Sequence, residues 1–99
     1  MIVEYLRYSI DEERRPAFEA AYERAEQPLV ASPHCLRYEL AQCVDEPGAY
    51  TVRIEWDSAE GHLRGFRRSA GFREFFEAVR PFVDDIEEMR HYHVQRVAS

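Results

Sequence analysis

The sequence has few cysteines and few glycines, and these shortages exclude several common kinds of site. Its two cysteines, Cys35 and Cys43, lie eight positions apart in 99 residues. In one extended strand, at about 3.3 Å per residue, they are too far apart for a disulfide, which needs Cα atoms within about 7 Å. The four glycines form no phosphate-binding loop and no Gly-x-Ser-x-Gly turn. We therefore expect free thiols, and neither a nucleotide enzyme nor a hydrolase of a standard kind.

The sequence also lacks an excess of positive charge and any long apolar run. Acidic residues outnumber basic ones by 19 to 13, and the arginines are interleaved with glutamates, so no basic stripe can neutralise phosphates. No apolar stretch approaches the ~20 residues of a membrane-spanning helix, and the N-terminus does not have the pattern of a signal peptide. We expect a cytoplasmic protein that binds neither nucleic acid nor membrane.

What the chain does contain is enough apolar sequence for one small domain, residues 1–99, with many aromatic rings. Hydrophobic residues make up 45% of the chain and aromatic residues 13%. That aromatic share is high for a small core and suggests a ring-lined interior or cavity. Because so short a chain buries only about two-thirds of its unfolded surface, an isolated monomer is expected to be marginally stable.

Hydrophobic periodicity predicts both strands and helices. Alternating residues favour strands over residues 2–8, 34–44, 50–56 and 86–97. Apolar residues spaced three or four apart favour a first helix that ends between Pro28 and Pro33. A second helix is expected from an N-cap at Ser58 to residue 68, with an interruption near 69–71 and a continuation to Pro81. The β-α-β-β-α-β order predicts an α+β, ferredoxin-like fold, in which a four-stranded antiparallel sheet carries its helices on one face.

The other face of this sheet needs a cover. Its side chains mix rings with charges and include Val3, Tyr5, Arg7, Arg37, Arg53 and Glu55. Such a face is too apolar for bare water and too charged for a core. The simplest cover is the same sheet of a second copy, with Arg–Glu pairing across strands. We therefore expect a homodimer formed through the open sheet face.

Aromatic residues on the helix-facing side form a candidate binding pocket. Leu36, Tyr38 and Leu40 are expected to point toward the helices, and so is Trp56. The candidate pocket residues are Tyr38, Trp56, Phe66, Phe72 and Phe76. Rings stack on a flat aromatic ligand, and the Trp N–H and Tyr O–H groups can orient it. The alternative is that these rings simply fill the core, which is the commoner role of aromatic stripes at helical spacing.

His62 is the candidate catalytic residue. It follows the expected N-cap by four residues and is the ionisable group nearest to the expected ring cluster. Because an imidazole changes protonation near neutral pH, His62 at the pocket mouth could accept or donate a proton. The alternative is a partly exposed surface histidine without a catalytic role.

The sequence gives no convincing metal site. His91 and His93 lie two apart on an expected strand and so face the same way, as two metal ligands would. No third ligand stands at a recognisable spacing, which favours a polar strand face at an interface. The acidic stretch 84–88 lacks the glycine-bearing register of a calcium loop and is interpreted as a solvated turn. We therefore expect no bound metal and no other cofactor.

Several segments together resemble the antibiotic biosynthesis monooxygenase family of the dimeric α/β-barrel superfamily, along essentially the whole chain. They are Ile2–Ile10, Phe18–Tyr22, Tyr38–Leu40, Arg53–Glu60, His62, Ser69 and Phe72. The segment from Trp56 through Ser58 to His62 is the most family-like. Two stretches, Phe66–Ser69 and Asp85–Tyr92, are similar to domains of this family that occur joined to truncated haemoglobins.

The resemblance implies a ferredoxin-like fold, a homodimer formed by sheet-to-sheet packing, and a pocket between sheet and helices. It also implies a cofactor-independent monooxygenase, because family enzymes oxidise polycyclic phenols or quinol precursors with dioxygen and no metal or flavin. In such an enzyme Trp56 and Tyr38 would position a small aromatic or quinol-like substrate, and His62 would handle the proton. The alternatives are a non-catalytic dimeric ligand-binding or interaction module, serving a haemoglobin or another redox protein, and a purely structural dimer.

The resemblance does not extend to haem degradation. A haem-degrading branch of the same fold uses an Asn on the first strand, a Trp on the second helix and a His iron ligand soon after it. The corresponding positions here hold Leu6, Phe66 and Phe76. Because a phenyl ring cannot ligate iron, we do not expect haem to be bound in that way.

Overall fold

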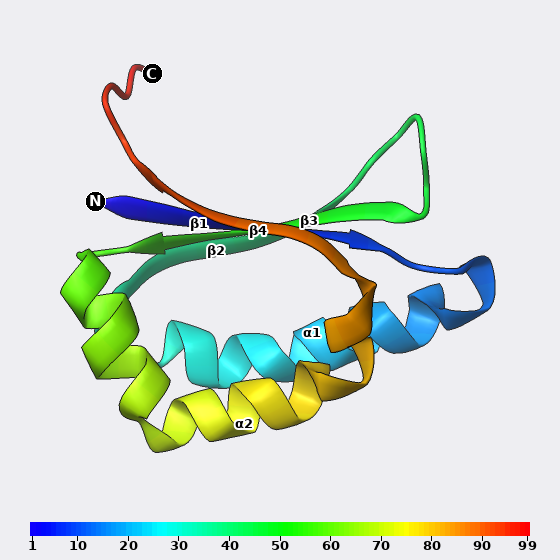
Figure 1. The fold of residues 1–99 in the computed structure, drawn as a ribbon, viewed down its shortest axis with the longest axis horizontal. Helices are drawn as coiled ribbons and strands as arrows, with labels where there is room; N and C mark the ends of the chain where they lie inside the picture. Colours follow the sequence, from blue (N-terminus) through cyan, green and yellow to red (C-terminus); the bar gives the residue numbers. More distant parts are fainter.

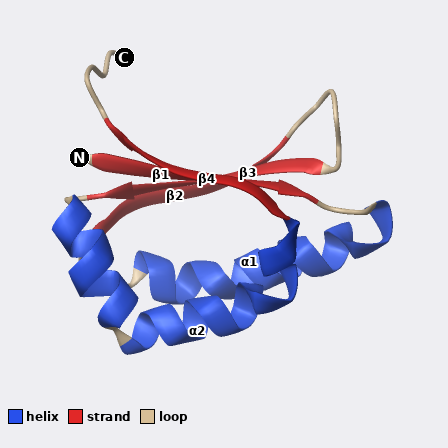
Figure 2. Cartoon of the chain, in the orientation of Figure 1, coloured by secondary structure: helices blue, strands red, loops and turns tan.

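The structure, a computed structural model that describes residues 1–99, is a single four-stranded antiparallel sheet with its helices on one face (Figures 1 and 2). The strands lie in the order β2-β3-β1-β4. Their bounds are Ile2–Ser9 for β1, Cys35–Gln42 for β2, Ala49–Trp56 for β3 and Ile86–His93 for β4. Helices α1 (Arg15–Val30) and α2 (Ala70–Val79) cover the same face, and the opposite face is bare (Figure 1). The predicted ferredoxin-like α+β fold is confirmed.

Helix α1 forms where the apolar stripe predicts it. Its buried residues are Phe18, Ala21, Tyr22, Ala25 and Leu29. Pro16 occupies the first turn, where a missing N–H costs no helical hydrogen bond. Pro28 lies inside the last turn, and the helix ends at Val30 just before the Ala31–Pro33 turn. The stripe packs α1 onto the sheet and fixes one half of the core.

Strand β2 departs from the predicted alternation. Cys35 pairs with Trp56, and Arg37 pairs with the next residue, Glu55, so Leu36 is an extra residue in a bulge. A bulge shifts the alternation of side chains between the two faces. The prediction that Leu36 points toward the helices is therefore wrong, because this side chain is 56% exposed and Cys35 packs against the core instead. Strands β2 and β4 are also shorter than the predicted 34–44 and 86–97.

The segment between β3 and α2 is helical but irregular. The Ser58 hydroxyl accepts a 2.9 Å hydrogen bond from the Gly61 N–H, which confirms Ser58 as the start. A π-helical segment, η2 (Gly61–Gly65), and a 3₁₀ turn, η3 (Phe66–Arg68), replace the regular helix expected to residue 68. The Ser69 hydroxyl then accepts from the Phe72 N–H at 3.2 Å and caps α2. Single π-helical turns are frequent at functional sites, and this one carries His62.

The bare face of the sheet carries charges that pair within the chain. Arg53 forms an ion pair with Glu55 of the same strand and donates a 3.1 Å hydrogen bond from Nε to the Tyr5 hydroxyl. Across strands, Arg7 pairs with Glu88 at 3.5 Å. Arg7 and Arg53 of this face thus find their acidic partners within the chain. None of the helices has both the length and the apolarity needed to cross a lipid bilayer.

Candidate active site

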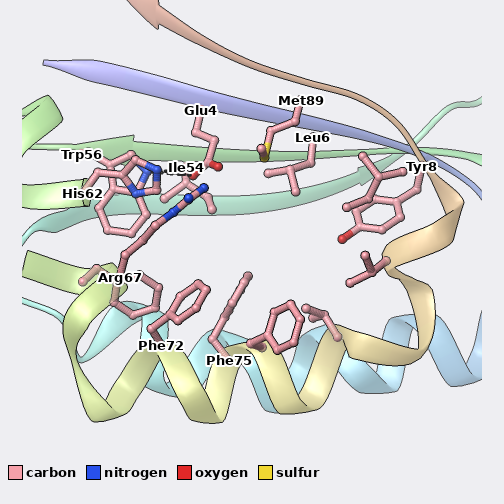
Figure 3. Close-up of a pocket in the computed structure, with 15 residues that line it drawn as sticks. Glu4, Leu6, Tyr8, Ile54, Trp56, His62, Arg67, Phe72, Phe75 and Met89 are labelled. Atoms are coloured by element: carbon pink, nitrogen blue, oxygen red, sulfur yellow. Dashed lines mark hydrogen bonds and ion pairs between the residues drawn. The ribbon is translucent and has the colours of Figure 1, made fainter. Parts of the chain in front are cut away.

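An apolar cavity of about 260 Å³ lies between the sheet and α2 (Figure 3). The floor of the cavity comes from β1, β3 and β4, and α2 supplies rings from the other side. Twelve of its fifteen lining residues are hydrophobic. Three of them, Phe76, Val83 and Met89, are each more than a third exposed, so the cavity opens to solvent between α2 and β4. The rings therefore leave a space, rather than filling the core completely.

Five of the six predicted site residues line this cavity, and one does not. The five are His62, Trp56, Phe66, Phe72 and Phe76. Tyr38 lies outside the lining and stacks on Tyr22, with ring centroids 6.3 Å apart. The physical reason is the strand order, because β2 is an edge strand next to α1 while the cavity reaches toward β4 at the opposite edge. The tyrosine that lines the cavity is Tyr8, whose hydroxyl is hydrogen-bonded to that of Tyr22 at 2.5 Å.

Glu4, His62 and Arg67 lie together at the Trp56 end of the cavity, whereas the Tyr8 hydroxyl lies at the other end (Figure 3). The indole of Trp56 stacks on the imidazole of His62, with ring centroids 4.5 Å apart, and its Nε1 donates a 3.0 Å hydrogen bond to Glu4 Oε1. His62 Nε2 lies 3.6 Å from Glu4 Oε1 and 3.1 Å from Nε2 of His91. His91 Nε2 lies 3.6 Å from the other carboxylate oxygen of Glu4. Glu4, His62 and His91 thus bring three potential metal ligands together from β1, η2 and β4.

His62 is buried, rather than partly exposed at the surface. Only 3% of this residue is accessible, and its Nδ1 has no hydrogen-bond partner. The turn η2 can approach the sheet closely because glycines stand at both of its ends. A Cβ at Gly61 would lie 2.1 Å from Asp57 Oδ1, and a Cβ at Gly65 would lie 2.3 Å from Cδ2 of His34. The glycines let η2 pack against the His34–Asp57 pair, and this packing places His62 over Trp56.

Burial favours the neutral forms of Glu4 and His62. Desolvation raises the pKa of Glu4, although the Trp56 hydrogen bond and the charges of His91 and Arg67 oppose the rise. Desolvation lowers the pKa of His62 to about 4, and the charges of Arg67 and His91 act in the same direction. His62 is therefore a neutral imidazole at neutral pH. A pKa of about 4 makes the free imidazole a weak base, which accepts a hydrogen bond from a ligand hydroxyl and takes up its proton when negative charge forms beside it, as on a phenolate.

Sequence reasoning missed three polar residues of this site. Glu4 could have been recognised from the sequence, because it is the only acidic residue among the side chains of β1 that face the core. It is 4% exposed in the structure. His91 lies directly opposite Glu4 in the β1–β4 register, a neighbour that the sequence alone does not reveal. Arg67 lines the cavity from η3 (Figure 3), and its position depends on the irregular turn that precedes it.

Comparison with known proteins places this site in a family. A family model for antibiotic biosynthesis monooxygenases matches residues 1–78. The uncharacterized protein YczJ of Bacillus subtilis (strain 168) is 25% identical over 92 residues, which cover 93% of this chain and 97% of YczJ.

Solved structures share the fold over almost their whole length. A protein from Bordetella bronchiseptica assigned to the antibiotic biosynthesis monooxygenases has a TM-score of 0.75 at 24% identity, covering 98% of this chain and 97% of that one. SnoaB, a cofactor-independent oxygenase from Streptomyces nogalater, has a TM-score of 0.79 at 14% identity, covering 97% and 94%. With the family match extending over most of the sequence and a sheet–helix cavity at its centre, the chain belongs to the antibiotic biosynthesis monooxygenase family.

Proposed function

We propose that the protein is a cofactor-independent monooxygenase that oxidises a small aromatic or quinol-like compound with dioxygen. The observation that carries the proposal is an apolar cavity lined at one end by the buried residues Glu4, Trp56 and His62, with the neutral imidazole of His62 against Trp56 and Glu4. Membership of the family supports it. The shared fold with SnoaB, named as a cofactor-independent oxygenase, is consistent with it.

The size of the cavity limits the substrate. An apolar cavity of about 150 Å³ can hold benzene, so about 260 Å³ suits a compound of one or two rings. Phe72 and Phe75 rise from α2 toward the sheet and offer ring surfaces for such a compound (Figure 3). Offset or edge-to-face contacts with these rings would hold a planar substrate between helix and sheet. A phenol or quinol of that size is the substrate class that we propose.

In the proposed reaction, His62 accepts the proton of a phenolic hydroxyl, and the resulting phenolate transfers electrons to dioxygen. The guanidinium of Arg67, which lines the cavity, stabilises the developing oxyanion. One oxygen atom enters the ring as a carbonyl, as when a phenol becomes a quinone. The other oxygen leaves as water with the two hydrogens that the substrate loses. The substrate supplies all the electrons, so the reaction needs no external reductant.

Oxygen uptake tests this proposal directly. The purified protein, treated with a chelator, is given small phenols and quinols in an oxygen-electrode cell, with product analysis for the quinone. We expect substrate-dependent uptake that His62→Ala lowers at least tenfold, in keeping with loss of a general base. His93→Ala is the matched control, because His93 lies on the same strand as His91 but outside the cluster. Absence of uptake, or equal uptake by His62→Ala, would contradict the proposal, and ligand binding without uptake would favour the binding module.

We also propose that the bare sheet face is covered by a second copy of the chain. Tyr92 on this face is 46% exposed and packs edge-on against Tyr5, with centroids 5.6 Å apart. Light scattering at micromolar concentration should therefore give twice the 11.7 kDa of one chain. Tyr92→Glu should shift the mass toward the single chain, whereas Val30→Glu, on an exposed position of α1, should not. A native protein of single-chain mass would exclude the dimer.

A further inference from the structure

Glu4 and His62 at the polar end of the cavity, together with the neighbouring His91, have a geometry that goes beyond proton transfer. Glu4, His62 and His91 each offer one ligand atom, and these atoms lie within 4.8 Å of one another. The two Nε2 atoms are 3.1 Å apart, and the carboxylate of Glu4 faces both, with Oε1 3.6 Å from His62 Nε2 and Oε2 3.6 Å from His91 Nε2. Ligands bound at about 2.0–2.2 Å to one ion are separated by distances of roughly 3 to 3.6 Å. The cluster therefore needs little rearrangement to surround an ion.

The backbone and one further hydrogen bond hold this arrangement. Glu4 and His91 are directly opposite each other on paired strands, so their separation is set by the sheet. The Trp56 indole donates to Glu4 Oε1 and orients the carboxylate, as groups behind metal ligands commonly do. His62 is held by its stacking on Trp56. In the absence of an ion, one of the two facing Nε2 atoms carries a hydrogen between them, and an ion would take the place of that hydrogen.

We propose that Glu4, His62 and His91 form a binding site for a divalent transition-metal ion of the Zn²⁺ class. Two imidazoles and one carboxylate are ligands that suit Zn²⁺ and its neighbours in the first transition row, and three ligands leave at least one coordination position open. The proposal goes beyond the monooxygenase function and does not rest on it. Nothing in it requires the ion to take part in a reaction.

Two features of the site moderate its affinity. The positive charge of Arg67 acts on both Glu4 and His62 and opposes a bound cation. Coordination through His62 Nε2 also places the ring hydrogen on Nδ1, which has no hydrogen-bond partner. We therefore expect weaker binding than in a structural zinc site. Because Arg67 is exposed at its position in η3, Arg67→Ala should strengthen binding without disturbing the fold.

Titration with Zn²⁺ alone, by calorimetry and by competition against a chromophoric chelator, tests the site on the full chain. We expect one ion per chain, with affinity lowered at least about tenfold in His91→Ala and in Glu4→Gln. His91 has a 38% exposed side chain, so its replacement should leave the protein folded. His93→Ala and a Cys35→Ser, Cys43→Ser protein are the controls, because they remove other potential ligands outside the cluster.

Each outcome decides the proposal. Binding that weakens in His91→Ala and Glu4→Gln but persists in both controls supports it. Absence of Zn²⁺ binding, binding unaffected by His91→Ala, or binding lost equally in a control would overturn it. The visible spectrum of bound Co²⁺ provides a second readout, which should lack a thiolate charge-transfer band.

The same titration separates this site from the proposed activity. An ion on His62 Nε2 keeps the ring hydrogen on Nδ1, so no ring nitrogen is left to accept a proton, and oxygen uptake should fall in step with Zn²⁺ occupancy. If Zn²⁺ binds and no substrate supports oxygen uptake, the metal site stands and the monooxygenase proposal fails. If oxygen uptake is seen and Zn²⁺ does not bind, the monooxygenase proposal stands and the metal-site proposal fails.

Discussion

The indole Nε1 of Trp56 donates a 3.0 Å hydrogen bond to Oε1 of Glu4, between two adjacent strands and fifty-two positions apart in the sequence. The two residues are only 1% and 4% exposed. The bond fixes a carboxylate at the end of an apolar cavity, and the face of the same indole supports the imidazole of His62. One side chain thus orients both polar groups from which we derive function.

Trp56→Phe should reveal how much this hydrogen bond contributes to the free energy of unfolding. The replacement leaves the buried Glu4 carboxyl without its donor, and a hydrogen bond to such a group contributes roughly 1.5–3 kcal/mol. We expect a loss of at least that size in the free energy of unfolding, measured by circular dichroism in urea. In a Glu4→Leu background the same change should cost less by about the same amount, because no carboxylate remains. Equal losses in the two backgrounds would show that the bond contributes nothing.

Val79→Phe should fill the cavity without touching its polar end. Val79 lines the cavity from α2 and is 4% exposed. A phenyl ring here occupies part of the ligand space, so we expect binding of small phenols to weaken at least tenfold. The free energy of unfolding should change by less than about 2 kcal/mol, because the added ring enters existing space. Trp56 is the single tryptophan and lines the cavity, so its fluorescence reports binding. The exposed Val30→Phe is the control, and undiminished binding by Val79→Phe would contradict the assigned cavity.

The fold was predictable because each element has its own periodicity. In β3 the buried residues are Tyr50, Val52, Ile54 and Trp56, as strict alternation requires. The bulge at Leu36 was not predictable, since it depends on how β2 pairs with β3. Because of this bulge, the Leu36 side chain is exposed and does not point toward the helices as predicted.

The candidate site was predictable only in part, for a different reason. Trp56 and the phenylalanines could be found because they lie on periodic faces directed at the core. Tyr38 was assigned wrongly, because periodicity gives the face of a strand but not its place in the sheet. Glu4 stood out as an acid among apolar residues, whereas its neighbour His91 follows from strand register alone. A cavity, finally, depends on the distance between helix and sheet, which no local pattern encodes.

Gly61→Ala should displace the turn that carries His62. A Cβ at this position would lie 2.1 Å from Asp57 Oδ1 and 2.8 Å from His34 Nδ1, so η2 or the His34–Asp57 pair must move. We expect a lower midpoint of thermal unfolding and altered Trp56 fluorescence, because His62 stacks on that indole. Gly71→Ala is the matched control, because a Cβ there meets no atom closer than 3.5 Å. Alanine also favours a helix by up to about 1 kcal/mol over glycine, so Gly71→Ala should be neutral or stabilising. Identical behaviour of the two variants would refute the close packing of η2.

The hydroxyl pair of Tyr8 and Tyr22 should make the fold sensitive to alkaline pH. Burial raises the pKa of Tyr8 to about 12, and burial beside Tyr8 also raises the pKa of Tyr22. An unfolded tyrosine titrates near pH 10, so above that pH the unfolded chain releases a proton that folded Tyr8 retains. The unfolded state then binds fewer protons, and the free energy of unfolding falls as pH rises.

For Tyr8 the fall amounts to roughly 3 kcal/mol between pH 10 and 12, since each pKa unit corresponds to about 1.4 kcal/mol. Below pH 10 the contribution is fully present and does not vary. Tyr8→Phe removes this titration, so its urea unfolding curves should depend less steeply on pH above 10, although its stability at pH 7 is lower for lack of the 2.5 Å bond. The slope of stability against pH separates loss of the titration from loss of the hydrogen bond. Loss of the bond lowers the free energy of unfolding at pH 7 and above pH 10 alike, whereas loss of the titration changes only the slope above pH 10. If native protein and Tyr8→Phe lose stability equally steeply above pH 10, Tyr8 does not retain its proton in the folded state.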